Sequence, residues 1–306
     1  MSNRKRKGRD VSGWLCLDKR VGQTSTAAVG AVKRLFDAQK AGHAGTLDPL
    51  ASGALPIALG EATKTVPYVQ DGRKIYRFTV RWGVETDSDD ADGNAVATAD
   101  ARPERAAIET VLAEFTGEIM QRPPTFSALK IEGERAYDLA REGVEVVLEE
   151  RPVSIHRLVL NGMPDRDHAV FDAECGKGTY VRALARDIGR RLGSLGHVSA
   201  LRRLAVGPFD EGAFVTLDAL IAAREAGPVA SLDGFLRPSG FGLRELPEIA
   251  FTSVDASRVR RGQSVLLRGR DAPILKGIAH ATFQGESIAI GEIEKGEFHP
   301  TRVFRG

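Results

Sequence analysis

The spacing of apolar and polar residues along the chain predicts both helices and strands. Residues 24–38 and 178–193 carry apolar side chains at helical spacing, whereas residues 74–83 alternate between polar and apolar positions as a half-buried strand does. The apolar positions of the second helical stretch are Val181, Leu184, Ile188 and Leu192. Strands and helices do not alternate strictly elsewhere, so we expect an α+β fold with a mixed, mainly antiparallel sheet.

Further segments extend this pattern and divide the chain. Strands are predicted at 13–20, 55–60, 153–161, 168–175 and 197–207, and helices at 61–69, 102–115 and 216–227. Pro103 opens one of these helices, because proline is tolerated in the first turn. A Gly- and Pro-rich stretch at 232–248 precedes short β-rich pieces separated by turn residues, which predict a small barrel. We therefore expect a large domain at 11–244 and a small one at 245–306.

Composition excludes several classes of protein. With 306 residues, 42% hydrophobic and 27% charged, the chain is not disordered, a coiled coil or a collagen. No stretch approaches the roughly 18 uninterrupted apolar residues of a membrane span, and Asp18 and Lys19 interrupt any signal-peptide core. We therefore expect a cytoplasmic protein without membrane contact. Cys16 and Cys175 form no CxxC motif, which argues against a disulfide framework and against a zinc site.

The net charge of +2 conceals an uneven distribution. The first nine residues carry five basic side chains and no acid, and we expect residues 1–10 to form a disordered basic tail. Residues 176–206 contain seven basic residues against Asp187 alone, and residues 256–270 contain five arginines and no acid. Two separate basic stretches indicate a long anionic partner, although a solvated face explains either stretch taken singly just as well.

One motif has the outline of a phosphate site. GKGTY at 176–180 joins a predicted strand to the N-terminus of a predicted helix, where backbone N–H groups can bind an anion. A P-loop requires another glycine five residues before Gly176, but Phe171 occupies that position. We therefore predict a tight strand-to-helix turn instead.

A second motif has the outline of a calcium loop. Its acidic residues are Asp87, Asp89, Asp90 and Asp92. With Gly93 at the sixth position of such a loop, the twelfth position, which requires a bidentate glutamate, is Ala99. The register fails, and a solvated turn is the favoured interpretation.

The loop GHAGTLDPLASG at 42–53 is harder to explain by packing. Pro49 restricts Asp48 to an extended conformation, and the flanking glycines allow the backbone to approach a bulky ligand. The loop also holds His43. Taken without any resemblance, an Asp-Pro step in a Gly-rich loop is more often a turn than a nucleophile.

Six ordered blocks resemble the bacterial tRNA pseudouridine synthase B family and together cover nearly the whole chain. The blocks are WLCLDKRVGQTS at 14–25, GHAGTLDPLASGALPIALGEATK at 42–64, KIYRFTVRWGVETDSDDADG at 74–93, FSALKIEGERAYDLAREG at 126–143, GKGTYVRALARDIG at 176–189 and HVSALRRLAVGPF at 197–209. Arg20 stands where the family usually has proline, and the last sixty residues match weakly. The resemblance implies a pseudouridine-synthase catalytic domain followed by a small β-rich, PUA-like RNA-binding domain.

The implied activity is that of an isomerase, a tRNA pseudouridine(55) synthase that needs no cofactor. The N1–C1′ bond of uridine 55 in the T-loop must break, the uracil must turn, and C5 must bond to C1′ and lose its proton. By similarity, Asp48 is the carboxylate that acts in the bond cleavage. It either attacks C1′ or removes a ribose proton to form a glycal, and the sequence leaves both routes open.

The resemblance assigns two further catalytic residues. Arg182 is implied to pair with Asp48 and to keep its carboxylate ionised. Tyr76 is implied to stack on the uracil and to assist removal of the C5 proton, although an ordinary half-buried strand tyrosine fits the pattern too. Arg186 and Arg190 follow Arg182 at helical spacing, so one face can serve both the site and the RNA, or carry a stripe of surface ion pairs.

Four more residues match family positions around the substrate. Tyr180 and Leu201 match residues that line the uracil pocket, where a core interpretation is equally consistent with their types. Lys19 matches a lysine that supports the catalytic loop. His43 matches the histidine that fills the space of the extruded base, since a uridine in a folded loop must be flipped at a cost of a few kcal/mol.

The implied partner is the T-arm of tRNA, bound by a monomer that requires no metal and no protein partner. The basic stretches at 176–206 and 256–270 would then contact RNA near the site and along the acceptor arm. Two rival functions are weaker. A binding-only RNA or ribosome-assembly protein has no need of Asp48, Tyr76 and Arg182 together, and a phosphoryl-transfer enzyme requires the phosphate motif whose spacing fails.

Overall fold

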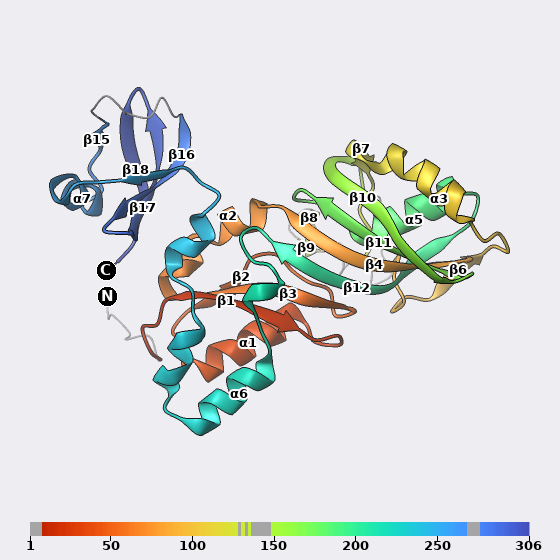
Figure 1. Ribbon diagram of the computed structural model, residues 1–306, viewed down its shortest axis with the longest axis horizontal. Helices are drawn as coiled ribbons and strands as arrows, with labels where there is room; N and C mark the ends of the chain where they lie inside the picture. Colours follow the sequence, from red (N-terminus) through yellow and green to blue (C-terminus); the bar gives the residue numbers. More distant parts are fainter. Residues whose placement is uncertain (1–7, 128–129, 132–133, 136–147, 268–275, 306) are drawn as a thin grey trace.

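The computed structural model describes residues 8–127, 130–131, 134–135, 148–267 and 276–305 (Figure 1). Most of the predicted basic tail, much of the block at 126–143 and two arginines of the basic stretch at 256–270, Arg268 and Arg270, lie outside the described residues. Arg9, which belongs to the predicted tail, is part of the fold instead: its guanidinium forms an ion pair with Asp233 at 2.7 Å.

A nine-stranded sheet organises the larger part of the chain. Its strands follow the order β13-β1-β3-β12-β4-β11-β10-β7, and β2 pairs with β3. Only the pairs β1–β13 and β3–β12 are parallel, so the expectation of a mixed, mainly antiparallel sheet is confirmed. The strands are β1 (Gly13–Lys19), β2 (Ala41–His43), β3 (Ala51–Leu59), β4 (Lys74–Trp82), β7 (Gly117–Gln121), β10 (Arg151–Asp165), β11 (His168–Cys175), β12 (Gly196–Val206) and β13 (Phe214–Val215).

Helices cover this sheet, and two of them depart from the predictions. The described α-helices of this part are α1 (Ser25–Leu35), α2 (Val66–Asp71), α3 (Arg105–Val111), α5 (Val181–Arg191) and α6 (Leu217–Ala226), whereas α7 (Ser253–Arg260) packs on the C-terminal sheet. The 3₁₀ helices are η1 (Gly60–Lys64), η2 (Leu112–Phe115), η3 (Glu211–Ala213), η4 (Val229–Phe235) and η5 (Ser239–Leu243). The helix predicted at 61–69 is split into η1 and α2. Pro103 lies outside α3, because Glu104 caps that helix and Arg105 begins it.

The core fills both faces of the sheet near β1. Leu15 and Leu17 pack into the cluster that α1, α3 and α5 cover, whereas Trp14 and Cys16 pack into a second cluster with residues of α2 and η5. A strand that is buried on both faces has no polar side to show. The apolar run of β1 therefore carries no alternation, unlike that of β4.

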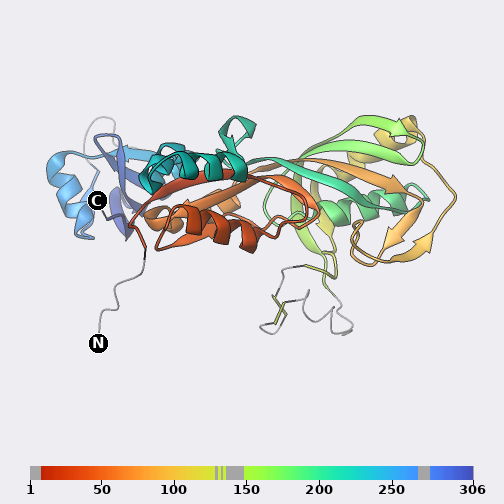
Figure 2. The same ribbon diagram turned by 90° about the horizontal axis from the view of Figure 1, so that it is seen from below.

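The C-terminal residues form a separate five-stranded sheet with its own core, which confirms the predicted β-rich end. Its strands are β14 (Glu248–Ala250), β15 (Val265–Leu266), β16 (Gly277–Phe283), β17 (Glu286–Glu294) and β18 (Glu297–Val303). Figures 1 and 2 place this sheet and α7 at one end of an elongated molecule, with β7, β10 and α3 at the other. Leu243, Ile290 and Phe304 join it to Tyr68 of α2. The boundary near residue 244 stays a prediction.

Two short hairpins complete the fold. They are β5 (Val84–Thr86) with β6 (Ala95–Thr98), and β8 (Lys130–Ile131) with β9 (Glu134–Arg135). Among the described residues, no helix combines the length and the apolar character that crossing a membrane would require.

Candidate active site

A pocket of about 520 Å³ lies where the large sheet meets the loop at 44–50 and the N-terminus of α5. This volume falls within the range of small-molecule sites. Five of the seven predicted site residues line it: Asp48, Tyr76, Tyr180, Arg182 and Leu201. They come from the loop, β4, α5 with its N-cap, and β12, so only the fold brings them together.

Asp48 is held on a loop whose backbone is fixed on both sides. The Ser25 hydroxyl, at the start of α1, donates to the Leu47 carbonyl and accepts from the Leu47 N–H, each at 2.9 Å. The Ala51 N–H donates to the Asp48 carbonyl at 3.0 Å and begins β3. Gly45 has a φ of 94°, a conformation that favours glycine. The Asp48 side chain remains 37% exposed at the pocket wall.

Arg182 joins two carboxylates in one charge network. Its Nε lies 3.0 Å from the Asp48 carboxylate, and its Nη1 lies 3.3 Å from that of Asp90. The guanidinium also donates to the carbonyl oxygens of Ser88 and Phe126, each at 2.9 Å. Burial raises the pKa of Asp90, while a hydrogen bond from Ser88 and the Arg182 charge oppose this shift. With so many fixed partners, Arg182 holds its position before any substrate arrives.

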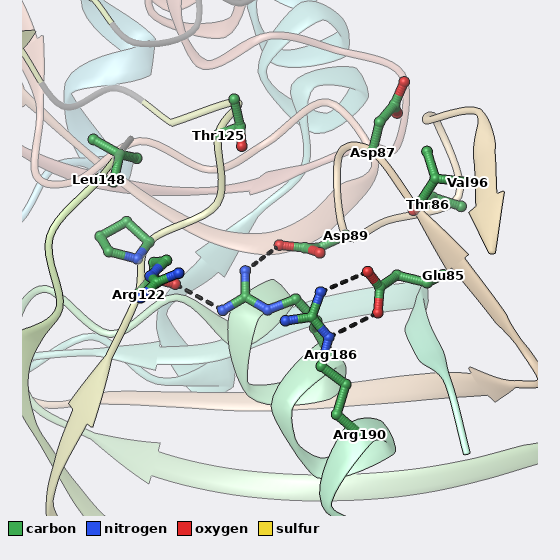
Figure 3. A pocket seen from close by; sticks show the side chains of 11 residues that line it. Glu85, Thr86, Asp87, Asp89, Val96, Arg122, Thr125, Leu148, Arg186 and Arg190 are labelled. Atoms are coloured by element: carbon green, nitrogen blue, oxygen red, sulfur yellow. Dashed lines mark hydrogen bonds and ion pairs between the residues drawn. The ribbon is translucent and has the colours of Figure 1, made fainter. Parts of the chain in front are cut away.

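The acidic run between β5 and β6 is buried at its centre, so its interpretation as a solvated turn is wrong. Asp89 and Asp90 are 6% and 5% exposed. Figure 3 shows the Arg186 guanidinium between Asp89, at 2.8 Å, and the Arg122 carbonyl, to which it donates at 2.8 Å. Burial raises the pKa of Asp89 to about 6, against the opposing charges of Arg186 and Arg182. The run supplies counter-charges to α5, because buried carboxylates need partners.

The basic stretch at 176–206 is largely neutralised within the protein. Besides Arg182 and Arg186, its ion pairs join Lys177 to Asp71, Arg190 to Glu85, Arg191 to Glu114 and Arg202 to Asp18. Figure 3 shows the two-pronged contact of Arg190 with Glu85. Of the two alternatives for Arg186 and Arg190, the structure shows the ion pairs, which they form with Asp89 and Glu85.

The two tyrosines of the pocket are half-buried, and the backbone of one of them, Tyr180, is held by a buried glutamine. Tyr180 is the N-cap of α5, and its N–H donates to Oε1 of Gln121 at 2.8 Å, while Nε2 of Gln121 donates back to the Tyr180 carbonyl at 3.1 Å. Gln121 itself is 2% exposed. Burial raises the pKa of Tyr180 and of Tyr76, and the nearby charge of Arg203 opposes the shift at Tyr76. Both phenols are neutral near pH 7.

Lys19 and His43 do not line the pocket. Lys19 is fully buried, and its Nζ donates to the carbonyls of Arg20 at 2.9 Å and Gln23 at 2.8 Å. Burial lowers the pKa of Lys19 to about 8, and the Asp48 carboxylate opposes that shift. His43 ends β2, just before the loop that carries Asp48, and its buried Nδ1 has no hydrogen-bond partner among the described residues. Burial also lowers the pKa of His43.

Three residues of the site were missing from the sequence prediction: Arg203, Asp90 and Gln121. Arg203 belongs to the basic stretch at 176–206, yet it is 1% exposed and lines the pocket. Strand alternation carries a signal for it, because Arg203 lies two residues after the buried Leu201 on β12. No local signal distinguishes Asp90 or Gln121, since their partners come from distant segments.

Comparison with known proteins gives this site a family. The family model described as "TruB family pseudouridylate synthase (N terminal domain)" matches residues 33–181, and that described as "tRNA pseudouridylate synthase B C-terminal domain" matches residues 182–243. The chain belongs to the TruB family of pseudouridylate synthases. The matched residues include Asp48, Tyr76, Arg182 and Leu201, and they end before the C-terminal sheet.

Curated relatives of this TruB-family chain match it over nearly its whole length. A protein of Bradyrhizobium diazoefficiens is 59% identical over 302 residues, which cover 98% of this chain and 88% of the relative. A protein of Agrobacterium fabrum is 56% identical over 306 residues, covering 99% of this chain and 97% of the relative. Both relatives are named tRNA pseudouridine synthase B, an isomerase.

Solved structures resemble the entire fold, including the C-terminal sheet. An archaeal box H/ACA sRNP Nop10–Cbf5 complex matches with a TM-score of 0.74 at 26% identity, over 96% of this chain and 86% of the other. An H/ACA RNP bound to a substrate RNA containing 2′-deoxyuridine matches with a TM-score of 0.75 at 25% identity, over 96% and 85% of the two chains. The order of the two sheets is thus shared with proteins of RNA-containing complexes.

Proposed function

We propose that this chain converts uridine 55 in the T-loop of tRNA to pseudouridine, with Asp48 as the reacting carboxylate. The observation that carries the proposal is the ion pair of Asp48 and Arg182, at 3.0 Å, on the wall of a pocket that Tyr76 also lines. The names of the curated relatives supply the class of RNA. As an isomerisation, the reaction consumes no second substrate.

The arrangement assigns a task to each group. The Asp48 carboxylate, paired with Arg182, attacks C1′ or removes a ribose proton, and the N1–C1′ bond breaks. The uracil turns within the pocket and bonds through C5 to C1′, which releases the Asp48 carboxylate from C1′ or, in the glycal route, returns the proton to the ribose. C5 then loses its proton and N1 gains one, so that the reaction is a net isomerisation. Because burial raises the pKa of Tyr76, this residue contributes its ring face and a neutral hydroxyl instead of a preformed phenolate. Tyr180 and Leu201 form the remaining walls against the base.

Entry of the uridine requires base flipping. Asp48 lies at the wall of a recessed pocket, which a base stacked in a T-loop cannot reach without extrusion. His43 sits beside the catalytic loop at the end of β2, and we assign it to the space that the extruded base leaves. Lys19 lies outside the pocket and supports it indirectly, because its hydrogen bonds to two carbonyls fix the segment between β1 and α1.

The C-terminal sheet, at 245–306, is proposed to bind tRNA beyond the T-loop as a PUA-like domain. Arg258, Arg260 and Arg261, in and just after α7, are exposed, and none forms an ion pair with an acid among the described residues. Exposed arginines without a carboxylate partner suit a phosphate backbone. We further propose a cytoplasmic monomer that acts without a protein partner.

The decisive experiment incubates the protein with an unmodified tRNA transcript and maps pseudouridine by position. We expect one pseudouridine per transcript, at position 55, and none in a transcript that carries cytidine there. Pseudouridine at another position would overturn the T-loop assignment, and its absence from both transcripts would overturn the activity.

The same assay tests the proposal that no metal takes part. Among the residues that the structure describes, no group of three His, Cys, Asp or Glu side chains is arranged to hold a metal ion. We expect EDTA to leave the rate unchanged when monovalent salt maintains the RNA fold. Loss of turnover that zinc or magnesium restores would contradict this part of the proposal.

A further inference from the structure

Arg203 is a buried cation without a carboxylate partner. It lies on β12 and is 1% exposed, and it forms no ion pair with any acid among the described residues. Its neighbour Arg202 points to the other face of β12 and pairs with Asp18 at 2.9 Å and with Glu211 at 3.4 Å. A guanidinium leaves water at a large cost unless its N–H groups are satisfied, so the hydrogen bonds of Arg203 show what it does.

The Arg203 guanidinium binds both ends of the catalytic loop. Nη2 donates to the Gly45 carbonyl at 3.1 Å and Nη1 to the Thr46 carbonyl at 3.2 Å, just before Asp48. Nε donates to the Ala54 carbonyl at 2.7 Å, on the strand that follows the loop. Three donors in a planar fork thus fix three carbonyls around the loop, a geometry that arginine provides and lysine does not.

The same side chain is adjacent to Tyr76. Arg203 and Tyr76 are directly paired in the β4–β12 ladder, so both side chains lie on the same face of the sheet. Burial raises the pKa of Tyr76, and the nearby Arg203 charge opposes that rise. Both residues line the pocket. Arg203 therefore connects the loop that carries Asp48 with the tyrosine that faces the base.

The packing around Arg203 leaves it little freedom to move. Gly53 pairs with Arg203 in the parallel β3–β12 ladder and has a φ of 98°. A Cβ added at Gly53 would lie 2.2 Å from the Arg203 carbonyl oxygen, so the two strands approach here as closely as glycine permits. Because the Arg203 backbone is held in this way, its guanidinium is a fixed support beneath the loop.

We propose that Arg203 is a positioning residue for the reaction. It holds the Asp48 loop and Tyr76 in the geometry that bond cleavage requires, and binding the substrate RNA is not its main role. The inference rests on the proposed function, in which Asp48 is the reacting carboxylate. A displacement of about 1 Å at a reacting group costs on the order of 100-fold in rate. Loss of the Arg203 guanidinium should therefore slow the chemical step more than it weakens tRNA binding.

The test compares Arg203→Lys with Arg202→Lys. The second variant is the control, because it replaces the guanidinium of the neighbouring arginine on the other face of β12. For each variant we measure the thermal unfolding midpoint first. The single-turnover rate at saturating enzyme and the tRNA affinity are then measured at a temperature well below that midpoint. For Arg203→Lys we expect a rate about 100-fold lower with unchanged tRNA affinity. For Arg202→Lys we expect the wild-type rate. This split between rate and affinity separates positioning from a general loss of folded protein.

A second variant leaves Arg203 in place and tests the same contact. Gly45→Ala places a Cβ 3.7 Å from Nη1 of Arg203, which is an ordinary van der Waals contact, but the φ of 94° is unfavourable for alanine. The backbone must rotate, and the Gly45 carbonyl moves away from the guanidinium. We expect the rate to fall here too, with tRNA affinity unchanged, whether or not Arg203→Lys folds.

The outcomes separate this inference from the proposed function. If Asp48→Asn is inactive while both Arg203→Lys and Gly45→Ala keep the wild-type rate, only the positioning inference falls. Equal rate losses in Arg203→Lys and Arg202→Lys would also overturn it. A wild-type protein that forms no pseudouridine in tRNA overturns the proposed function, and the inference that depends on it falls as well.

Discussion

The two basic stretches of this chain both combine many basic residues with almost no acid, but their side chains have different partners in the structure. At 176–206, six of the seven basic residues form ion pairs with acids that lie elsewhere in the chain, and the seventh is the buried Arg203. At 256–270, the described arginines are exposed and pair with no described acid. Positive charge along a sequence is therefore not positive charge on a surface. The first stretch builds the site, and the second is left available to a polyanion.

The physical reason is the depth at which each stretch lies. Helix α5 and strand β12 pack into the centre of the large sheet, where an arginine without a partner would be destabilising. Helix α7 packs on an outer sheet through Ala256 and Val259, and its arginines reach water. The comparison makes four predictions, because it assigns the chemistry and the folding energy to one stretch and RNA affinity to the other.

The largest effect is expected at the carboxylate that the first stretch holds. Asp48→Asn should slow isomerisation by about 10⁴-fold or more, the scale of removing a reacting group, while tRNA affinity stays unchanged because the loop backbone is kept. Single-turnover assays and binding titrations measure both. Asp92→Asn, in the exposed part of the acidic run, is the control and should keep the wild-type rate. An Asp48→Asn variant that still turns over would show that Arg182 pairs with it for structural reasons alone.

The next effect is on stability, within α5. Arg186→Met leaves Asp89 buried without its partner, and we expect the free energy of unfolding to fall by about 3–5 kcal/mol. Arg191→Met, on the same helix, breaks an exposed pair with Glu114 and should cost no more than about 1 kcal/mol. Urea denaturation measures both. Adding Asp89→Asn to Arg186→Met should recover part of the loss, and similar losses for the two single variants would refute the distinction between buried and exposed pairs.

The pH dependence of stability should report the burial of Asp89. Its folded pKa is raised to about 6, so between about pH 4 and pH 6 the folded protein binds more protons than the unfolded chain. The free energy of unfolding therefore decreases as pH rises through that window, by at most about 3 kcal/mol from this group. Denaturation of the wild type and of Asp89→Asn at several pH values gives the difference. Curves that run parallel would mean that Asp89 ionises normally.

The smallest effect is expected in the second stretch, and it concerns affinity. Replacing Arg258, Arg260 and Arg261 together with alanine should weaken tRNA binding by about 10-fold and reduce the salt slope by about 2 to 3, because fewer counterions are released. The single-turnover rate at saturating enzyme should not change. Substitution is a cleaner test than removing residues after 244, since truncation would strip Ile290 and Phe304 from the core at Leu243.

A matched control keeps net charge out of that comparison. Arg77, Arg105 and Arg191 are exposed arginines that already pair with Asp172, Glu109 and Glu114. Replacing these three with alanine changes the net charge by the same amount. We expect tRNA affinity to change less than in the α7 variant. Equal losses of affinity would show that overall charge, and not the unpaired position of the α7 arginines, determines binding.

Local patterns in the sequence were sufficient for much of the fold and for part of the site. The period of 3.6 residues located α1 and α5, and the period of two located β4, because burial of one face needs no knowledge of the partner. The loop at 42–53 was singled out by its glycines, and the resemblance of its block pointed to Asp48. The predicted ends of some elements were wrong by a few residues. Pro103, for example, was predicted to open a helix but lies just outside α3.

The tertiary structure alone decided which charges are buried and with which partners. Asp89 and Arg186 are 97 residues apart in sequence, and Arg203 meets the Gly45 carbonyl across 158 residues. Whether a charged residue is solvated or buried depends on the groups that the fold brings to it, because desolvation is tolerated only when a partner or a set of carbonyls satisfies the charge. The acidic run and the basic stretch each have the composition of a surface. Their central residues, Asp89 and Asp90 in the one and Arg182 and Arg186 in the other, are buried because they face each other.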